Sequence, residues 1–576
     1  MAKAPTNKKP ASKAKKVTKG FEETLWDTAN QLRGSVESSE YKHVVLSLVF
    51  LKFISDKFEA RRQKMIDEGQ DAFVGMKEFY QQDNIFFLPE EARWSFVKAR
   101  AKQDDIAIII DTALSTIEKN NPSLKDALPD NYFSRQGLEV KKLASLIDSI
   151  ENIDTLVREG KSNECDMSEE DLVGRVYEYF LGKFAATEGK GGGEFYTPKS
   201  VVTLLAEMLE PFQGKIYDPA CGSGGMFVQS LKFIKEHQGR SKDIAIYGQE
   251  LTSTTYKLAK MNLAIRGLSG NLGERAADTF FADQHKDLKA DYIMANPPFN
   301  LKAWRNEAEL TDDPRFAGYR TPPTGNANYG WILHMLSKLS ETGTAGFVLA
   351  NGSMSSNTSG EGDIRQQLIE NDRVECMIAL PGQLFFTTQI PVCIWFITKD
   401  KTENIAKGFR NRQQETLFID AREMGTMISR TNKALTKDDI ALIADTYHAW
   451  RSTDEAWQKR RVERVTAKEE VADKHGENAN PLPKEGTGAL IGEKYPVEKY
   501  QDQAGFCKSA SITDIKANDF VLTPGRYVGA AEVADDGIAF ETKMRALSQT
   551  LYRQMDQSKE LDKAIRHNLE ALGYGE

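Results

Sequence analysis

The residues of this sequence best suited to chemistry form one short turn, Asn296-Pro297-Pro298-Phe299. An exocyclic amino group on a nucleobase is a poor nucleophile, because its lone pair is delocalised into the ring. If the Asn296 side-chain oxygen and the Pro297 carbonyl each accept one amino hydrogen, the nitrogen is drawn toward tetrahedral geometry. Its lone pair can then attack an electrophilic methyl group. Phe299 can stack on the base, which is worth roughly 1–3 kcal/mol. A base in a duplex has to flip out to reach such a turn.

The segment before this turn predicts how the turn is positioned. Residues 290–294 form a short apolar run that is typical of a buried parallel strand. Pro297 and Pro298 cannot continue the hydrogen-bond ladder, and they stiffen the chain where the strand stops. An open α/β sheet normally binds its ligand at the carboxyl end of such a strand. The alternative is an ordinary strand-ending turn with a structural Asn, so a second motif has to decide.

The second motif is a glycine-rich loop between a predicted strand at 215–218 and a predicted helix at 227–233. It is not the dinucleotide fingerprint, because Phe227 stands where a third spaced glycine would be, and it lacks the Lys-Ser/Thr pair of a P-loop. Its small residues let a cofactor lie close to the backbone, beside a carboxylate. A ligand with a cationic sulfonium and an amino acid moiety fits better than a phosphate. The residues predicted to contact the cofactor here are Asp218, Pro219, Gly222, Ser223, Gly224 and Gly225.

Two further acidic positions follow at the ends of predicted elements. The strand at 244–249 ends at Glu250, the position from which an acid chelates ribose hydroxyls. Asp278 lies in the turn 277–280 and is predicted to accept a hydrogen bond from an adenine amino group of the cofactor. Acids at strand ends are common, so each position alone is a weak signal. Their order and spacing together make the signal strong.

A well-formed helix start precedes the glycine loop. Thr197 is predicted to be the N-cap and Pro198 the first residue of a helix that runs to about Leu209. The exposed N–H groups of such a start can hold a carboxylate of the cofactor, and the aromatic pair before it can cover the cofactor. The alternative is merely a capped helix behind a glycine linker. The candidate cofactor residues of this segment are Glu194, Phe195, Tyr196, Thr197, Pro198 and Lys199.

These motifs resemble those of a known family. Residues 218–226, Glu250, Asp278 and the turn 296–299 are similar to the motifs of amino-methyltransferases that use S-adenosyl-L-methionine. Asn before the prolines resembles the N6-adenine type, whereas N4-cytosine enzymes more often begin this turn with Ser. The position of 194–199 before the glycine loop matches the first cofactor motif of that family.

Segments outside the catalytic motifs narrow the resemblance. Leu32-Arg33-Gly34 and residues 41–45 resemble the N-terminal domain of the methylation subunit (HsdM) of type I restriction-modification systems, and residues 520–528 resemble a segment near its end. The resemblance implies a modification subunit that methylates N6 of adenine in DNA, with the target chosen by a separate specificity subunit. The implied partners are double-stranded DNA, the specificity (S) subunit, a second copy of the chain in an M2S1 complex and, as a further partner, the restriction (R) subunit. The alternatives are a protein glutamine N5-methyltransferase and a non-catalytic assembly subunit.

Other elements are predicted to complete the site. Strands at 346–350 and 374–380 are followed by Val392–Thr398, which is expected to close the sheet. Phe385 or Phe386, before the last strand, is a candidate second aromatic wall for the target base, with Phe386 slightly favoured. The polar stretch 301–328 is either a lid near the flipped base or a long loop.

Composition limits the class of protein. The 576 residues are 40% hydrophobic and 28% charged, no apolar run approaches a membrane span, and the N-terminus lacks a secretory h-region. Five scattered cysteines form no metal pair or disulfide framework, which indicates a reducing cytoplasm and no metal. The resemblance to type I systems implies a bacterium or archaeon. The first 20 residues carry seven lysines and no acid, so the net charge of −8 leaves −15 for the rest of the chain. Another subunit is therefore expected to supply much of the grip on DNA.

The fold predicted from these patterns is α/β. It is a doubly wound, mostly parallel, Rossmann-like methyltransferase sheet, preceded by an all-α N-terminal domain and followed by a C-terminal helical extension. A stripe close to heptad spacing from Phe540 to Leu569 either packs on its own domain or docks on a partner's helices. The predicted parts are a disordered basic arm (1–20), a helical domain (21–165), the methyltransferase domain (166–430), an extension with a mobile insertion (431–535) and an amphipathic docking helix (536–576).

Overall fold

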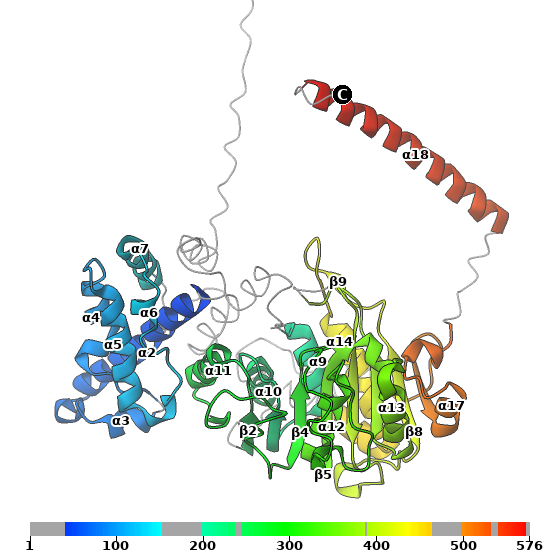
Figure 1. Ribbon diagram of the computed structural model, residues 1–576, viewed down its shortest axis with the longest axis horizontal. Coiled ribbons are helices and arrows are strands. Elements are labelled where there is room, and N and C mark those ends of the chain that lie inside the picture. The colour runs from blue at the N-terminus through cyan, green and yellow to red at the C-terminus, as the bar shows by residue number, and fades with distance from the viewer. Residues whose placement is uncertain are drawn as a thin grey trace, which may run out of the picture. The chain divides into compact units, whose positions relative to one another are not determined.

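The computed structural model describes residues 41–83, 85–152, 197–236, 243–385, 389–463, 497–530 and 540–571 (Figure 1). They belong to two compact units, one that extends to Val528 and one that begins at Gly529. No helix in these ranges is both long and apolar enough to cross a lipid bilayer.

The first described part is entirely helical. In α5 (Ile106–Asn120), the apolar residues Ile106, Ile110 and Leu114 recur at helical spacing and are buried. The longest helix, α2 (Tyr41–Asp67), supplies a large share of the same hydrophobic core. The remaining elements of this part are η2 (Asp71–Phe73), α3 (Lys77–Gln81), η3 (Glu90–Ala92), α4 (Trp94–Ala99), η4 (Pro122–Leu124), α6 (Tyr132–Arg135) and α7 (Val140–Glu151).

A nine-stranded sheet forms the second part, in the order β11-β8-β6-β7-β5-β4-β1-β2-β3. Most neighbours are parallel, but β7 runs antiparallel to both β5 and β6, and β11 runs antiparallel to β8. The strands are β1 (Gly214–Asp218), β2 (Ile244–Gly248), β3 (Gly270–Asn271), β4 (Ala290–Ala295), β5 (Leu339–Ala350), β6 (Val374–Ala379), β7 (Val392–Thr398), β8 (Glu415–Asp420) and β11 (Cys507–Ser511). A separate hairpin pairs β9 (Thr426–Met427) with β10 (Lys433–Ala434).

Helices cover both faces of the sheet. Residues of α12 (Asn328–Lys338) and α13 (Glu361–Glu370) pack in one core, whereas α9 (Lys199–Leu209), α10 (Gly225–Glu236) and α14 (Lys437–Arg451) pack in another. The central strands β6 and β7 are buried along their whole length, as expected for strands covered on both faces. The predicted doubly wound, mostly parallel sheet with a preceding helical part and a C-terminal helix is confirmed. The short elements not yet named are η7 (Pro314–Phe316), η8 (Asn351–Met354), η9 (Thr358–Gly360), η10 (Ile405–Lys407), α17 (Ile512–Ala517) and η12 (Pro524–Arg526).

Helix α11 (Ser253–Ile265) joins the two parts. Tyr256 and Leu263 pack with the sheet, whereas Leu258 and Met261 join the core of the N-terminal helices. The Lys257 ammonium donates a hydrogen bond to the Leu128 carbonyl at 2.9 Å. The helix is therefore apolar on two faces because each face has its own core to fill.

Two details of the predicted elements are wrong. Val392–Thr398 does not close the sheet, because β7 inserts between β5 and β6, and β8 and β11 extend the sheet further. Thr197 is not the N-cap of α9, since Pro198 occupies that position with extended ψ and the helix begins at Lys199. The Thr197 hydroxyl instead accepts a hydrogen bond from the Asn296 amide.

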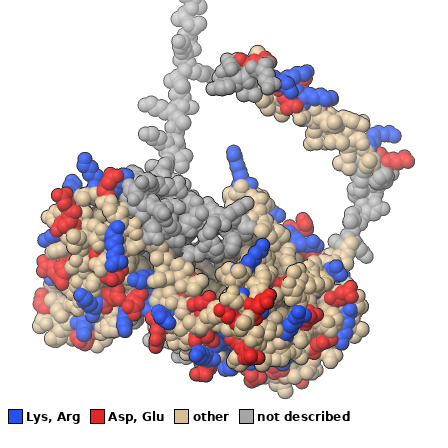
Figure 2. All heavy atoms as spheres, viewed as in Figure 1, with Lys and Arg blue, Asp and Glu red and all other residues tan. Residues whose placement is uncertain are grey.

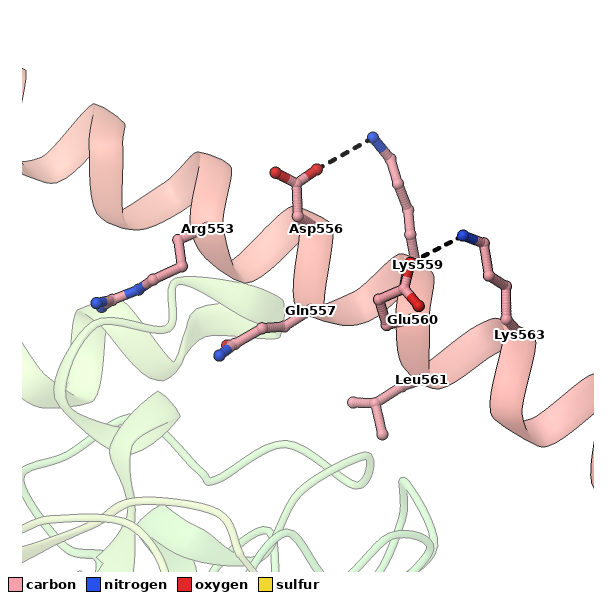
Figure 3. Close-up of a pocket in the computed structure, with 7 residues that line it drawn as sticks. All are labelled: Arg553, Asp556, Gln557, Lys559, Glu560, Leu561 and Lys563. Carbon is pink, nitrogen blue, oxygen red and sulfur yellow. Dashed lines mark hydrogen bonds and ion pairs between the residues drawn. The ribbon is translucent and has the colours of Figure 1, made fainter.

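The second unit contains the single described helix α18 (Phe540–Ala571). Met544, Leu547, Leu551 and Ile565 are exposed along it. Figure 3 shows a shallow hollow on this helix, where Arg553, Gln557 and Leu561 point to one side. The other side carries the ion pairs Lys559–Asp556 and Lys563–Glu560, at 3.4 and 2.8 Å. The helix thus exposes a stripe of apolar side chains, next to a side whose charged residues form ion pairs within the helix.

Candidate active site

Three strand ends meet where the strand order reverses. The chain runs outward from β1 to β2 and β3, then returns to place β4 on the other side of β1, with Tyr217 beside Ile293. The crevice at such a reversal is the usual ligand site of an open α/β sheet. Asp218 ends β1, Glu250 follows β2, and Asn296 directly follows β4. The structure therefore brings the predicted catalytic turn beside the glycine loop, on adjacent strands.

The amide of Asn296 is oriented by a contact from a distant segment. Its nitrogen donates a hydrogen bond to the Thr197 hydroxyl at 2.9 Å, across 99 positions of sequence. This contact fixes which side of the amide carries the oxygen, as an acceptor for an amino group requires. Pro297 is buried and Pro298 is half-buried, so the turn is held in place as well as stiffened.

The end of the turn is fixed by a reciprocal pair of asparagines. Asn300 has a φ of 53°, in the left-handed region that Asn tolerates better than most residues. Its backbone N–H donates to the Asn328 side chain at 2.9 Å, and the Asn328 amide donates back to the Asn300 side chain at 2.9 Å. Asn328 begins α12 and is buried. This reciprocal contact between Asn300 and Asn328 was not predicted. The two residues are 28 positions apart, and no local sequence pattern indicates that they pair.

Of the two candidates for the second aromatic contact with the target base, Phe385 and Phe386, the structure describes only Phe385. The Phe385 side chain is 1% exposed and meets the half-buried Phe299 ring edge to face, with centroids 6.0 Å apart and an interplanar angle of 85°. In this position Phe385 backs the Phe299 ring rather than offering a free face to a base. Phe386 lies outside the described residues.

The glycine loop is held from both sides. The Asp218 carboxylate accepts a hydrogen bond from the Ala220 N–H at 3.0 Å. The Glu250 carboxylate accepts one from the Gly222 N–H at 3.1 Å and another from the Thr252 N–H at 2.9 Å. Gly222 has a φ of 53°, and a Cβ there would meet nothing within 4 Å. The loop thus leaves open space beside its backbone, next to two carboxylates.

The third acidic turn is tied to the other two. The Asp278 carboxylate accepts hydrogen bonds from the N–H groups of Phe280 and Phe281, at 2.7 and 3.3 Å. The Ala277 N–H donates to the Glu250 carbonyl at 2.9 Å, and the Thr279 hydroxyl donates to the Pro219 carbonyl at 2.6 Å. The three acids predicted to bind one cofactor therefore lie on one connected set of turns.

Burial shapes the electrostatics of these turns. Burial, with a contribution from the Glu250 carboxylate, raises the pKa of Asp218 to about 8, against the opposing hydrogen bond from Ala220. Burial also raises the pKa of the Cys221 thiol well above its ordinary value, which disfavours a thiolate nucleophile. A buried carboxyl group beside a second carboxylate favours a positively charged ligand.

The long segment 301–328 supports the Asp278 turn. Trp304 and Phe316 are buried, and the Trp304 ring lies 4.4 Å from that of Phe280. Arg315 donates to the Thr279 and Phe280 carbonyls at 2.9 and 2.5 Å. Sequence reasoning missed Arg315, although aromatic residues inside a polar stretch were a usable signal that this stretch packs. Between the predicted alternatives of lid and loop, these contacts favour a packed loop.

The remaining predicted cofactor residues are placed as follows. Glu194, Phe195 and Tyr196 lie outside the described residues, Lys199 is exposed at the start of α9, and Pro198 is buried at its N-cap. Ser223 is held through its carbonyl, which accepts a hydrogen bond from the Asn262 amide of α11 at 2.8 Å. Gly224 has a φ of 79°, a conformation that favours glycine. Gly225 is the first residue of α10.

Comparisons with known families give two matches along the chain. The model described as N-6 DNA Methylase matches residues 168–480 and 458–536. The model described as HsdM N-terminal domain matches residues 21–150.

Curated relatives and solved structures agree with these matches. The chain is 44% identical to the type I restriction enzyme HindI methylase subunit of Haemophilus influenzae, over 84% of this chain and 100% of that one. It is 35% identical to the MjaIX methylase subunit of Methanocaldococcus jannaschii, over 97% of this chain and 92% of that one. Its fold is similar to that of a type I restriction-modification methyltransferase subunit from Streptococcus thermophilus. That similarity has a TM-score of 0.66 at 21% identity, over 88% of this chain and 99% of the other.

Proposed function

Because the chain belongs to the methylase subunits of type I restriction enzymes, we propose that its site transfers a methyl group from S-adenosyl-L-methionine to N6 of an adenine flipped out of duplex DNA. It is the modification subunit of such an enzyme and an N6 DNA methyltransferase by family. The family matches favour neither a protein glutamine methyltransferase, in which the same kind of turn serves, nor an inactive assembly subunit.

The residues of the three acidic turns fit the proposed cofactor. When bound, S-adenosyl-L-methionine supplies a methyl group on a positively charged sulfur. Asp218 and Glu250 would hold its cationic and hydroxyl-bearing parts, and Asp278 would bind the adenine amino group. The raised pKa of Asp218 and the open space beside Gly222 support a cationic ligand at this position. Among the other candidate contacts, Pro198 and Lys199 at the start of α9 would bind the cofactor's carboxylate, together with the loop residues already named.

The turn after β4 would act on the target base. The Asn296 side-chain oxygen and the Pro297 carbonyl would accept the two amino hydrogens, which directs the nitrogen lone pair toward the methyl group. Phe299 would stack on the base, with Phe385 fixing its ring from behind. The transfer would be driven by proximity and alignment rather than by a strong general base.

One observation carries this assignment: the hydrogen bond from the Asn296 amide to Thr197. It orients the amide and joins the catalytic turn to the start of α9, where the cofactor's carboxylate would bind. Both substrates would thus be held by one set of contacts around the end of β1.

Recognition of DNA would be shared with partner subunits. On the face seen in Figure 2, acidic and basic residues are interspersed over the coloured part, with no broad basic patch. The net charge of −8 agrees with this distribution. We therefore assign sequence recognition to a specificity subunit, with a second copy of this chain and a restriction subunit as further members of a cytoplasmic complex. The exposed stripe of α18 would be the docking element within 536–576.

The proposal assigns a role to each of the predicted domains of the chain. The helical domain (21–165) would help to enclose DNA, and the methyltransferase domain (166–430) would hold the site. The extension (431–535) contributes α14 and β11 to the same sheet domain. The arm (1–20) would make at most weak phosphate contacts.

Transfer of a radiolabelled methyl group tests the proposed function. The chain is assayed with unmethylated genomic DNA, alone and after co-purification with the specificity subunit. We expect label in DNA from the complex, recovered as N6-methyladenine after digestion. Label in protein, or none at all from a folded complex, would contradict the proposal.

A further inference from the structure

The β9–β10 hairpin, residues 424–435, projects from the same edge of the sheet as the catalytic turn. It follows β8, which is parallel to β6, and β6 runs in the same direction as β5 and β4 because both β5 and β6 are antiparallel to β7. The Ala421 N–H donates to the Ala379 carbonyl at 2.9 Å, where β6 ends. The hairpin therefore starts at the carboxyl edge, and β9 lies beyond the sheet in Figure 1.

The base of the hairpin is fixed to the aromatic support of the site. Asn432 is buried, and its amide donates to the Phe385 carbonyl at 3.2 Å. The Lys433 N–H donates to the Gln383 carbonyl at 2.9 Å. The Phe385 ring in turn contacts the ring of Phe299, the proposed base-stacking residue. Phe385 is therefore the single residue between the hairpin and Phe299.

The tip of the hairpin is ordered by its own contacts but exposes apolar side chains. The Ile428 N–H donates to the Asn432 carbonyl at 2.9 Å, which closes the turn. Met427 is 49% exposed and Ile428 is 59% exposed. About half of each of these two large apolar side chains is thus open to solvent in the described structure.

The charge of the hairpin differs from that of the chain. From Met424 to Leu435 the sequence contains Arg430 and Lys433 and no acid, although the whole chain carries −8. Arg430 is exposed and makes no hydrogen bond or ion pair with any residue in the described ranges. An unpaired cation beside apolar tip residues, with the hydroxyl residues Ser429 and Thr431 on either side of it, suits a phosphate backbone and stacked bases.

We propose that the β9–β10 hairpin is a DNA finger that enters the duplex at the target adenine. Met427 and Ile428 would occupy the space from which the base is flipped, and Arg430 would contact a flanking phosphate. Proteins that unstack DNA commonly insert such apolar wedges. The inference rests on the proposed function, because it takes the target base to be the one held by Asn296 and Phe299. A protein partner at the tip is a different hypothesis that the experiment separates.

Base flipping in the intact complex tests the wedge. The complex with the specificity subunit is mixed with a duplex that contains its methylation site, mapped by sequencing, with 2-aminopurine in place of the target adenine. The variants are Met427→Ser with Ile428→Ser, and Ile405→Ser as the matched control. Ile405 is 86% exposed. It lies at the opposite edge of the sheet from the catalytic turn, because the nearby Lys407 ammonium donates a hydrogen bond to the carbonyl of Thr342, near the start of β5.

On the 2-aminopurine duplex we expect the double variant to lose most of the fluorescence increase. On the same duplex with adenine at the target position, it should lose about tenfold or more of the methyl-transfer rate. Cofactor affinity should stay within about twofold of the wild type, and Ile405→Ser should behave like the wild type. Flipping and transfer by the double variant at the level of the control would overturn the proposal. The proposal would also be overturned if the double variant, but not the Ile405→Ser control, failed to co-purify with the specificity subunit. The hairpin tip would then contact a protein. Absence of transfer by the wild-type complex would instead refute the proposed function.

The salt dependence of DNA binding tests Arg430. Loss of one phosphate contact in Arg430→Gln should reduce the slope of log K against log salt by about one. An unchanged slope would remove Arg430 from the proposed contact.

Discussion

At the scale of single residues, Asn296 separates chemistry from cofactor binding. Its amide is positioned by Thr197 and directly follows β4, whereas the acids proposed to hold the cofactor lie at the ends of β1 and β2 and in the turn at Asp278. Asn296→Ala should therefore reduce methyl transfer by about a hundredfold or more, a loss typical of a preorganised hydrogen-bonding group. Phe299→Ala should act in the same direction.

Isothermal calorimetry and single-turnover transfer measure the two effects of Asn296→Ala separately. Cofactor affinity should change by less than about twofold. The matched control is Asn404→Ala, in a turn at the opposite edge of the sheet, where the side chain only accepts a hydrogen bond from the Lys407 N–H. If a folded Asn296→Ala protein lost cofactor binding and transfer equally, the assigned role would be wrong.

The identity of the catalytic residues was predictable, but their support was not. Asn296-Pro297-Pro298-Phe299 stood out because amide, prolines and aromatic ring are adjacent in sequence. Thr197 holds Asn296 from 99 positions away, and nothing in the order of residues encodes that contact. Phe385 and Phe386 are neighbours with the same side chain, so only the structure shows that Phe385 is buried.

Asp218 makes cofactor binding dependent on pH. Burial raises its pKa to about 8 from its ordinary value of 3.8. Between these values the folded protein holds a proton that the unfolded chain has released, so the contribution of Asp218 to stability decreases as pH rises. A cationic ligand favours the carboxylate, and its binding near pH 7 should release up to about one proton.

Proton release can be measured from the calorimetric enthalpy of cofactor binding at pH 7 in phosphate and in Tris, which differ in ionisation enthalpy. The enthalpies should differ, and the difference should fade above about pH 9, where the carboxylate is already ionised. Asp218→Asn should abolish the difference at pH 7. Equal enthalpies in both buffers for the unaltered protein would contradict a neutral Asp218.

At the scale of elements, Arg315 connects the segment before α12 to the Asp278 turn. Its five N–H groups all have acceptors: the Asp313 carboxylate, the His334 ring and the carbonyls of Thr279 and Phe280. Burial, and then the Arg315 charge, lowers the pKa of His334 to about 3, so this ring is neutral and accepts from Arg315. The turn is thus held by a guanidinium whose geometry a lysine cannot reproduce.

Arg315→Lys should weaken cofactor binding by about tenfold, because a lost hydrogen bond to a charged group costs about 1.5–3 kcal/mol and only part of that reaches the site. The matched control is Arg305→Lys. Arg305 binds the carbonyls of Pro322, Asn306, Glu307 and Glu309 within the same segment and does not contact the Asp278 turn. Both variants should lower the melting temperature, but only Arg315→Lys should raise the cofactor Kd. Equal Kd values for the two variants would limit Arg315 to a structural role.

The elements show the same division between local and long-range information. The bounds of β7 were predicted from one apolar run, Val392–Thr398, but not its antiparallel place between β5 and β6, which depends on strands outside that run. β11 was not predicted, because Cys507-Lys-Ser-Ala-Ser511 is hardly apolar, as an edge strand can be. It forms only because β8, far away in sequence, offers a free edge.

At the scale of the whole molecule, the division into two units separates the site from the proposed docking helix. The described contacts of the active site all lie before Val528, and α18 belongs to the second unit. A helix with Leu547, Leu551 and Ile565 exposed in water has no internal reason to keep that stripe. We infer that the stripe serves assembly and that catalysis needs α18 only through the complex.

Removal of residues 529–576 should therefore leave folding and cofactor affinity unchanged while abolishing co-purification with the specificity subunit and methylation of DNA. A finer variant is Leu547→Asp with Leu551→Asp, which places charge on the exposed stripe. Its control is Lys563→Gln, on the side of α18 where Lys563 pairs with Glu560 (Figure 3). Light scattering should give the mass of an M2S1 complex for the wild type and the control, but that of the free chain for the stripe variant. A truncated chain that still assembled and methylated DNA would show that the contacts of the first unit suffice, and α18 would then need another role.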